Sequence, residues 1–342
     1  MRAAVFKGIE KIEVEDLPEP EAGNDDVVVK VHACGICGSD LHTYLHGAFV
    51  QPGQVMGHEF VGEVVHVGGS VEGIAVGDRV TASPIVPCMQ CARCEEGRYN
   101  LCGAAWANGI AYGRPGAFAE FVKIPSPVVG SNVFLLGPEI SDAGGALVEP
   151  LAVGVHAVRL VESVKGATAL VLGLGTIGLQ VVQALRAHGA GRIIGIDLSA
   201  TRVEAGAAVG AEAFDGSEGI ANVLAGVLAA DEEIDVVFEC TGATAAADAA
   251  LEVVRAGGTI IVLALYDDPI TFDPTVLVQR EIRLQGSIAY TSEDFREAVE
   301  LLSSGVARVD PLITHHEPLD KIDEAFSMQL RKNESIKVLV EP

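Results

Sequence analysis

The chain has 342 residues, 49% hydrophobic and 20% charged, and its 47 acidic residues outnumber 23 basic ones to give a formal charge of −24. This length favours two domains, and the composition is that of a globular protein rather than a disordered one. The acidic excess argues against nucleic acid or an anionic membrane as a partner of the bulk surface. The N-terminal residues lack the apolar core of a secretory signal, and no run matches the roughly 18 to 20 apolar residues of a membrane span. We therefore expect a cytoplasmic protein.

Residues 1–150 have the pattern of an all-β domain. Short runs rich in β-branched residues are separated by glycine, proline and asparagine, which is how strands and turns alternate in such domains. The runs predict strands at 26–33, 60–68, 77–83 and 116–124.

From residue 166 onward the pattern changes to alternating strands and helices. The first pairs are strand 167–175 with helix 176–189, and strand 192–199 with helix 200–210; strands at 233–242 and 258–265 then flank an alanine-rich helical run at 243–258. Such alternation is typical of a parallel sheet with helices on both faces. After residue 285 we expect a helix at 292–305, with Ser292 as its N-cap, and a closing strand at 335–341.

Four of the seven cysteines are concentrated in one short segment. Cys88, Cys91, Cys94 and Cys102 have the spacing C-x2-C-x2-C-x7-C. In a reducing compartment such a set predicts a closed, structural Zn²⁺ site; buried or redox-active thiols are the alternative. A zinc-binding nucleic-acid module is disfavoured because the loop is acidic.

A second set of metal-ligand residue types lies elsewhere. Cys37 stands in a glycine-rich turn, His58 and Glu59 follow Gly57 at the start of an apolar run, and Glu149 precedes a proline. Cysteine, histidine and a carboxylate suit a catalytic Zn²⁺ that keeps one open position. Taken alone, each of these signals is weak, and a lone cysteine in a glycine-rich turn is more often structural than catalytic.

A dinucleotide-binding fingerprint follows the strand at 167–175. Gly173, Gly175 and Gly178 form G-x-G-x-x-G, with Thr176 and Ile177 inside it, and the motif opens a helix. The glycines let the backbone approach a pyrophosphate at the helix N-terminus. Asp197, 19 residues after Gly178, is positioned to accept hydrogen bonds from a ribose and to repel a 2′-phosphate, which favours NAD over NADP; the next basic residue is Arg202.

These motifs together resemble the zinc-containing medium-chain dehydrogenases. The likeness spans nearly the whole chain and includes "GICGSDLH", "GHEFVGEVVHVG", the four-cysteine loop, "LVEPLAV", "GLGTIG" and "FECTG". It implies an α/β protein in which a GroES-like β-barrel catalytic domain accompanies a Rossmann domain with a doubly wound parallel sheet, and an active site in the cleft. The implied boundaries are 1–152 for the catalytic domain, 153–286 for the NAD-binding domain and 287–342 for a return to the catalytic domain.

Within that family the chain looks like the polyol branch, which includes sorbitol, butanediol and threonine dehydrogenases. The resemblance makes Cys37, His58 and Glu149 zinc-associated, with Glu59 a direct or exchangeable ligand; whether Glu149 binds zinc directly or through water is left open. Ser39 matches the family's hydroxyl relay position, and His46 matches a position that can border the substrate pocket. His42, three residues after Ser39, is expected to pass the proton on to solvent. Arg202 joins the glycine loop and Asp197 as a cofactor-binding residue.

The expected reaction is the reversible oxidation of a secondary alcohol, diol or polyol to a ketone, with zinc as Lewis acid and NAD as hydride acceptor. Threonine or a primary alcohol is an alternative substrate. A zinc-free reductase of the same superfamily and a non-catalytic NAD-sensing protein are the rival classes. By analogy with bacterial relatives, we expect a homo-oligomer, a tetramer or a dimer, whose only other partner is the small alcohol or ketone.

Overall fold

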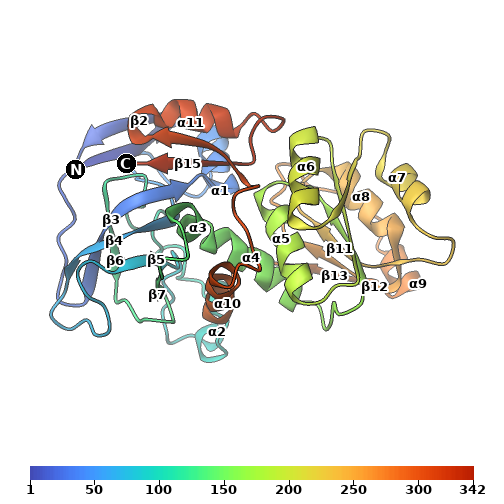
Figure 1. Ribbon diagram of the computed structural model, residues 1–342, viewed down its shortest axis with the longest axis horizontal. Helices are drawn as coiled ribbons and strands as arrows, with labels where there is room; N and C mark the ends of the chain where they lie inside the picture. The colour runs from blue at the N-terminus through green and yellow to red at the C-terminus, as the bar shows by residue number, and fades with distance from the viewer. The chain divides into compact units, whose positions relative to one another are not determined.

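The computed structural model describes residues 1–342 and forms two compact units. The first unit joins Met1–Ala152 to Tyr290–Pro342, and the second is Val153–Ala289. Figure 1 shows both chain ends in the first unit, because the C-terminal segment returns to the sheet that the N-terminal segment builds.

The first unit is built around a seven-stranded sheet with the strand order β14-β15-β3-β4-β5-β7, in which β6 pairs with β3. All pairings are antiparallel except that of β14 with β15. The strands are β3 (Asp26–Gly35), β4 (Glu59–Val67), β5 (Arg79–Ala82), β6 (Phe121–Pro125), β7 (Val133–Leu135), β14 (Ile313–Pro318) and β15 (Lys337–Glu341). A separate antiparallel pair consists of β1 (Arg2–Gly8) and β2 (Lys11–Asp16).

The first unit also contains helices. They are α1 (Gly38–His46), α2 (Ala92–Glu95), η1 (Tyr99–Leu101), α3 (Asp142–Ala146), α10 (Ser292–Ser303), η2 (Leu319–Lys321) and α11 (Ile322–Gln329), and the chain leaves the unit within α4 (Val148–Arg159). The core brings inward-facing residues of the strands together with Phe118 and with Phe326 of α11, whose rings meet edge to face at 5.8 Å. This packing explains why the last helix and strand belong to the N-terminal unit.

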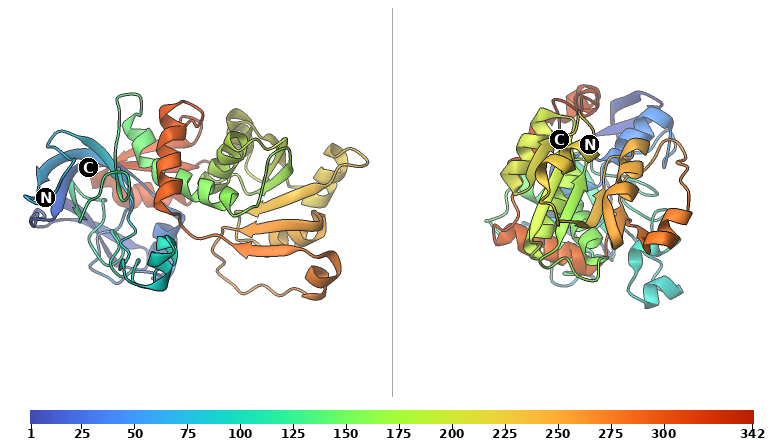
Figure 2. Two further views of the ribbon diagram at one scale, coloured as in Figure 1. Left: turned by 90° about the horizontal axis from the view of Figure 1, so that it is seen from below. Right: turned by 90° about the vertical axis from the view of Figure 1, so that its right-hand side faces the viewer.

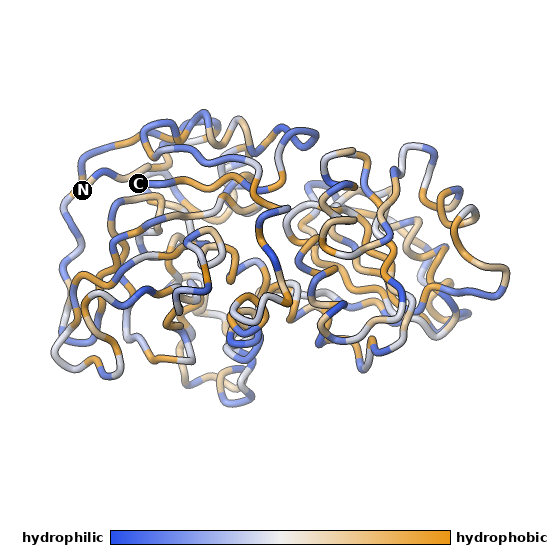
Figure 3. The backbone as a smooth tube through the Cα atoms, in the orientation of Figure 1, coloured by the Kyte–Doolittle hydropathy of each residue, from blue (hydrophilic) through white to orange (hydrophobic).

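The second unit is a six-stranded parallel sheet with the order β10-β9-β8-β11-β12-β13. Its strands are β8 (Thr168–Leu172), β9 (Arg192–Asp197), β10 (Glu212–Asp215), β11 (Ile234–Glu239), β12 (Val254–Val262) and β13 (Arg283–Gly286). The helices between them are α5 (Thr176–Ala187), α6 (Ala200–Val209), α7 (Ile220–Val227), α8 (Thr244–Val253) and α9 (Thr275–Arg280). Helices α5 and α6 lie on one face of this sheet and α8 lies on the other, as Figure 2 shows. Figure 3 shows the hydrophobic strands that these helices cover.

Three sequence-based expectations need correction. The helical run at 243–258 ends at Val253, because Val254–Val262 pairs with β11 as strand β12. The N-cap of α10 is Thr291 rather than Ser292: the Thr291 side chain accepts from the Asp294 N–H, and Asp294 accepts from Thr291 in return. The strand expected at 116–124 occupies only Phe121–Pro125.

None of the helices combines the length and the apolar character that crossing a bilayer requires. The longest ones, such as α4 and α5, have 12 residues.

Candidate active site

Three predicted metal-ligand residues meet in the first unit. The ligand atoms of Cys37, His58 and Glu59 all lie within 4.8 Å of one another. Cys37 precedes α1, and the other two stand at the start of β4. Gly57 makes this approach possible, since its φ is +89° and a Cβ there would lie 2.8 Å from the backbone nitrogen of Phe118. A thiolate, an imidazole and a carboxylate at such distances fit Zn²⁺.

Asp40 lies beside two of these ligand residues. Its Oδ2 accepts the backbone N–H of Cys37 at 3.0 Å, and its Oδ1 lies 3.8 Å from Nδ1 of His58. That Nδ1 is buried and has no hydrogen-bond partner. A carboxylate beside the second nitrogen of a metal-binding histidine is the usual way to set the ring's orientation. The sequence analysis missed Asp40, because the helix that places it beside these ligands was itself not predicted.

Glu149 lies outside this group of three. It stands in the first turn of α4 and is 7% exposed, and its Oε1 accepts a hydrogen bond from the Tyr290 hydroxyl at 2.9 Å. Burial raises the pKa of Glu149 to about 7, against the opposing effect of that hydrogen bond. Tyr290, 141 residues away in sequence, was not among the expected site residues.

The expected proton-relay residues lie on α1. Ser39 is one turn from His42, whose ring centroid is 6.1 Å from that of His46. The Ser39 hydroxyl is 3.2 Å from the hydroxyl of Tyr112, and the Tyr112 ring centroid lies 5.4 Å from that of His58. The ring of Trp106, the only tryptophan, braces Tyr112 edge to face. The loop that contains Trp106 and Tyr112 therefore reaches the metal-ligand group.

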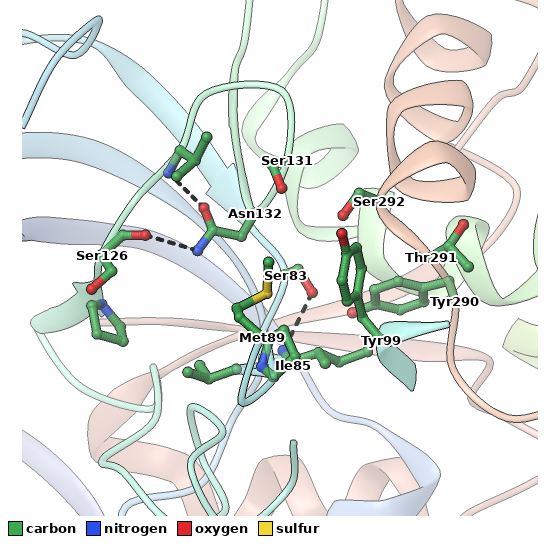
Figure 4. Close-up of a pocket in the computed structure, with 14 residues that line it drawn as sticks. Ser83, Ile85, Met89, Tyr99, Ser126, Ser131, Asn132, Tyr290, Thr291 and Ser292 are labelled. Atoms are coloured by element: carbon green, nitrogen blue, oxygen red, sulfur yellow. Dashed lines mark hydrogen bonds between the residues drawn. The ribbon is translucent and has the colours of Figure 1, made fainter. Parts of the chain in front are cut away.

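A separate cavity of about 230 Å³ lies beside Tyr290 (Figure 4). Its wall includes Met89 and Tyr99 of the cysteine loop and Asn132, whose side chain is hydrogen-bonded to Ser126 and Val128. None of the predicted zinc ligands lines it. It meets the candidate active site only at Tyr290.

The four-cysteine loop gathers its thiols into one group. The sulfur atoms of Cys88, Cys91, Cys94 and Cys102 lie within 4.8 Å of one another. The backbone N–H of Cys88 donates to Cys102 Sγ at 3.3 Å and lowers the pKa of that thiol to about 6, whereas burial raises the pKa of Cys94 to about 11. Four converging thiols leave no position for a substrate, so the geometry suits a structural Zn²⁺.

The glycine motif of the second unit forms a phosphate cradle at the start of α5. Gly173, directly after β8, has a φ of +87°, and a Cβ on Gly178 would overlap its carbonyl oxygen. Thr176 and Ile177 are the first residues of α5, so their N–H groups lie at its positive end. The bare backbone leaves room for a pyrophosphate.

Asp197 closes the other side of this loop. It ends β9, and its carboxylate accepts the backbone N–H groups of Leu174 at 2.7 Å and Ser199 at 2.9 Å. The guanidinium of Arg202 lies 4.0 Å from it. The structure thus brings the glycine loop, Asp197 and Arg202 together at the carboxyl ends of β8 and β9, which fits a dinucleotide.

Two family models match this chain. Residues 23–131 match the model of the alcohol dehydrogenase GroES-like domain, and residues 176–304 match that of the zinc-binding dehydrogenases. Sorbitol dehydrogenase of Bacillus subtilis (strain 168) is 36% identical over 354 aligned positions, which cover 100% of this chain and 97% of the relative. The chain belongs to the zinc-containing medium-chain dehydrogenases.

Solved structures of this dehydrogenase family superpose along the whole chain. 2R,3R-butanediol dehydrogenase from Bacillus subtilis is 32% identical with a TM-score of 0.88, covering 100% of this chain and 99% of its own. A putative zinc-binding dehydrogenase from Sinorhizobium meliloti 1021, bound to NADP, is 34% identical with a TM-score of 0.89 and the same coverage. The expected GroES-like and Rossmann folds are confirmed, and the protein is an oxidoreductase that uses zinc and a nicotinamide dinucleotide.

The dehydrogenase has one further buried charge that the sequence analysis missed. Lys337 of β15 extends its ammonium group to Glu59 Oε2 at 2.6 Å and donates to the Ile36 carbonyl at 2.8 Å. The Lys337 and Glu59 side chains are 2% and 1% exposed. Burial lowers the pKa of Lys337, but the carboxylate of Glu59 outweighs this effect and the net pKa is raised. The sequence signal that could have identified this residue is a lysine inside the apolar run of the last strand.

Replacing Lys337 by methionine leaves Glu59 buried without its cation. We expect the free energy of unfolding to fall by about 3 kcal/mol, because breaking a buried pair strands the remaining charge. Denaturant unfolding of metal-free protein measures the loss, because Zn²⁺ at the Cys37, His58 and Glu59 group would supply Glu59 with another cation. Lys123→Met, which breaks the more exposed pair with Asp26, is the control and should cost no more than about 0.5 kcal/mol. Equal losses for both variants would contradict this role of Lys337.

Proposed function

We propose that this dehydrogenase reversibly oxidises a secondary alcohol of a diol or polyol to a ketone, with NAD as the hydride acceptor. The observation that carries the proposal is the convergence of the Cys37, His58 and Glu59 ligand atoms within 4.8 Å. The similarity to a sorbitol dehydrogenase and to a butanediol dehydrogenase supports the substrate class.

The proposed catalytic zinc site uses Cys37, His58 and Glu59, with Glu149 as a direct or water-mediated fourth contact. When bound, zinc supplies Lewis-acid polarisation of the substrate oxygen. Tyr290 holds the Glu149 carboxylate by its hydroxyl, and Lys337 holds that of Glu59, so both carboxylates are fixed by protein partners. Cys88, Cys91, Cys94 and Cys102 are proposed to hold a second, structural zinc.

Proton release is proposed to begin at Ser39 and to continue through His42. Both side chains are partly exposed on α1, and imidazole titrates near neutral pH. Tyr112, whose hydroxyl is 3.2 Å from that of Ser39, fixes the serine side chain beside His58. NAD, when bound, accepts the hydride, while the protein residues hold and move the proton.

The substrate class is tested by initial rates of NADH formation with ethanol, 2-propanol, 2,3-butanediol, sorbitol, xylitol and threonine. We expect a clear preference for one diol or polyol. A preference for threonine or for ethanol would replace the proposed substrate by the alternative one, and no rate with any of them would overturn it.

The cofactor preference is proposed to depend on Asp197. Its carboxylate places a negative charge where the 2′-phosphate of NADP would lie. Asp197→Ser should therefore lower the preference for NAD, measured as kcat/KM with NAD divided by kcat/KM with NADP, by about 100-fold. This factor corresponds to the loss of one charge-assisted hydrogen bond. The Sinorhizobium relative makes the test sharp, since a chain that is 34% identical to this one is bound to NADP. Asp273→Ser, which removes an exposed carboxylate that accepts from Thr275, should leave the ratio unchanged. An unchanged ratio in Asp197→Ser would exclude the proposed role.

We also propose that the enzyme acts in the cytoplasm as a homo-oligomer, a dimer or a tetramer. All seven cysteines are free thiols, as a reducing compartment requires. Strand β13 ends the parallel sheet with all four of its residues exposed, including Leu284 at 42%, and unpaired sheet edges favour pairing with another chain. Light scattering at working concentration tests this; a monomer would overturn it.

A further inference from the structure

A fully buried carboxylate stands at the end of β11, outside every site described above. Glu239 is 0% exposed. Its Oε1 accepts the backbone N–H groups of Thr241 at 2.7 Å and Gly242 at 3.1 Å, and also the Thr241 hydroxyl. Its Oε2 accepts the hydroxyl of Tyr266 at 2.7 Å. All of these donors are neutral.

Burying such a carboxylate costs free energy because it loses its hydration, and an apolar residue at this position would avoid that cost. What Glu239 provides instead is a junction between two loops. Its side chain holds the loop after β11 through Thr241 and Gly242 and the loop after β12 through Tyr266. Its carbonyl oxygen also accepts the backbone N–H of Leu263 at 2.9 Å. One residue therefore fixes both loops relative to each other.

This junction lies at the point where the strand order of the parallel sheet reverses. The chain builds β9 and β10 on one side of β8 and then places β11 and β12 on the other side. The N–H of Cys240 donates to the carbonyl of Leu172, the last residue of β8, so the two carboxyl ends are adjacent. A Cβ on Gly173 of the phosphate cradle would lie 2.8 Å from the Thr241 methyl group.

A dinucleotide binds across such a reversal with one nucleotide on each side. Asp197 ends β9 and therefore marks the side of the adenosine half. The nicotinamide half then lies over the carboxyl ends of β11 and β12, where Glu239 holds the two loops. This assignment rests on the proposed function, in which the unit Val153–Ala289 binds NAD.

We propose that Glu239 is a positioning residue for the nicotinamide half of the cofactor. It does not touch the cofactor; it acts through Thr241, Gly242 and Tyr266, which it holds in one arrangement beneath the ring. The adenosine half depends on Asp197 and the glycine cradle and is independent of Glu239.

The test compares Glu239→Gln with a matched control, Asp235→Asn, at the opposite end of the same strand. Asp235 pairs with Arg255 at 2.7 Å and accepts the N–H of Thr168, so it is a strand-end carboxylate with a purely structural setting. Calorimetric titration measures the Kd of NADH and the Kd of ADP, which carries only the adenosine half and the pyrophosphate. Turnover of the preferred alcohol with and without deuterium at the carbinol carbon reports hydride transfer.

For Glu239→Gln we expect NADH binding to weaken about tenfold, with ADP binding unchanged and a larger deuterium isotope effect on kcat, because a misplaced ring slows the hydride step. Tyr266→Phe, which removes one hydrogen bond, should show the same pattern more weakly. Asp235→Asn should leave both Kd values and the isotope effect unchanged. Lower thermal stability alone, or equal weakening of NADH and ADP, would overturn the inference. A wild-type protein that binds neither NADH nor ADP would instead overturn the proposed function.

Discussion

Replacing Cys37 by serine is expected to remove the active-site zinc and to lower kcat/KM by at least about 10³-fold. The thiolate is one of three ligands that meet within 4.8 Å, and a neutral hydroxyl in its place neither balances the metal's charge nor matches its softness. Loss of Lewis-acid stabilisation is worth several kcal/mol, and about 4 kcal/mol corresponds to the stated factor. The zinc content measured by metal analysis should fall by about one ion per chain, since the cysteine loop and its zinc are unchanged.

Cys34→Ala is the control for this experiment. Cys34 is also a thiol of the same segment, three residues earlier, but it is fully buried in β3, and burial raises its pKa well above the usual range. We expect the zinc content and the turnover of the Cys34→Ala variant to stay near those of the wild type. Full activity and metal content in Cys37→Ser would refute the catalytic-zinc proposal.

The second large effect is expected from Cys102→Ser in the four-cysteine loop. Cys102 is 2% exposed, and its sulfur receives the N–H of Cys88, which favours the thiolate. Without it the loop loses its zinc, and removal of a structural metal belongs to the changes that cost about 4 kcal/mol or more. Chemical unfolding should therefore show a marked loss of stability.

The same variant should keep its chemistry while it remains folded. The folded fraction, counted by NADH binding, should turn over within a few-fold of the wild type, because this loop contributes no ligand to the Cys37 group. Cys240→Ala, at a half-buried cysteine of the other unit, controls for the loss of a cysteine. Wild-type stability in the zinc-free variant would rule out the structural role.

Periodicity located the elements whose apolar pattern is strong. The runs at 26–33 and 60–68 correspond to β3 (Asp26–Gly35) and β4 (Glu59–Val67), because alternation on a half-buried sheet is visible in the sequence. Helix α1 was missed because its sequence, GSDLHTYLH, carries glycine and histidines in place of a clear apolar stripe. The boundary between α8 and β12 was missed because the Val253–Val254 step has no breaker and is decided by pairing with β11.

The site residues that belong to a local sequence motif could be predicted. Those that act through contact with a residue far away in the sequence could not. Cys37, His58, Glu59 and the glycine loop belong to recognisable local patterns. Lys337 contacts Glu59 across 278 residues, and only the return of β15 to β3 brings the two side chains together. Tyr290 reaches Glu149 in the same way, and no local pattern contains that pairing.

The most direct test of the account is the rate of NADH formation from the preferred polyol as zinc is withdrawn and restored. The enzyme is treated with a chelator until about one metal equivalent per chain is lost, assayed, and then supplied with Zn²⁺. The account predicts that activity disappears with that equivalent and returns with zinc, while NADH binding persists throughout. Undiminished NADH formation by protein whose Cys37 site has been emptied would contradict it.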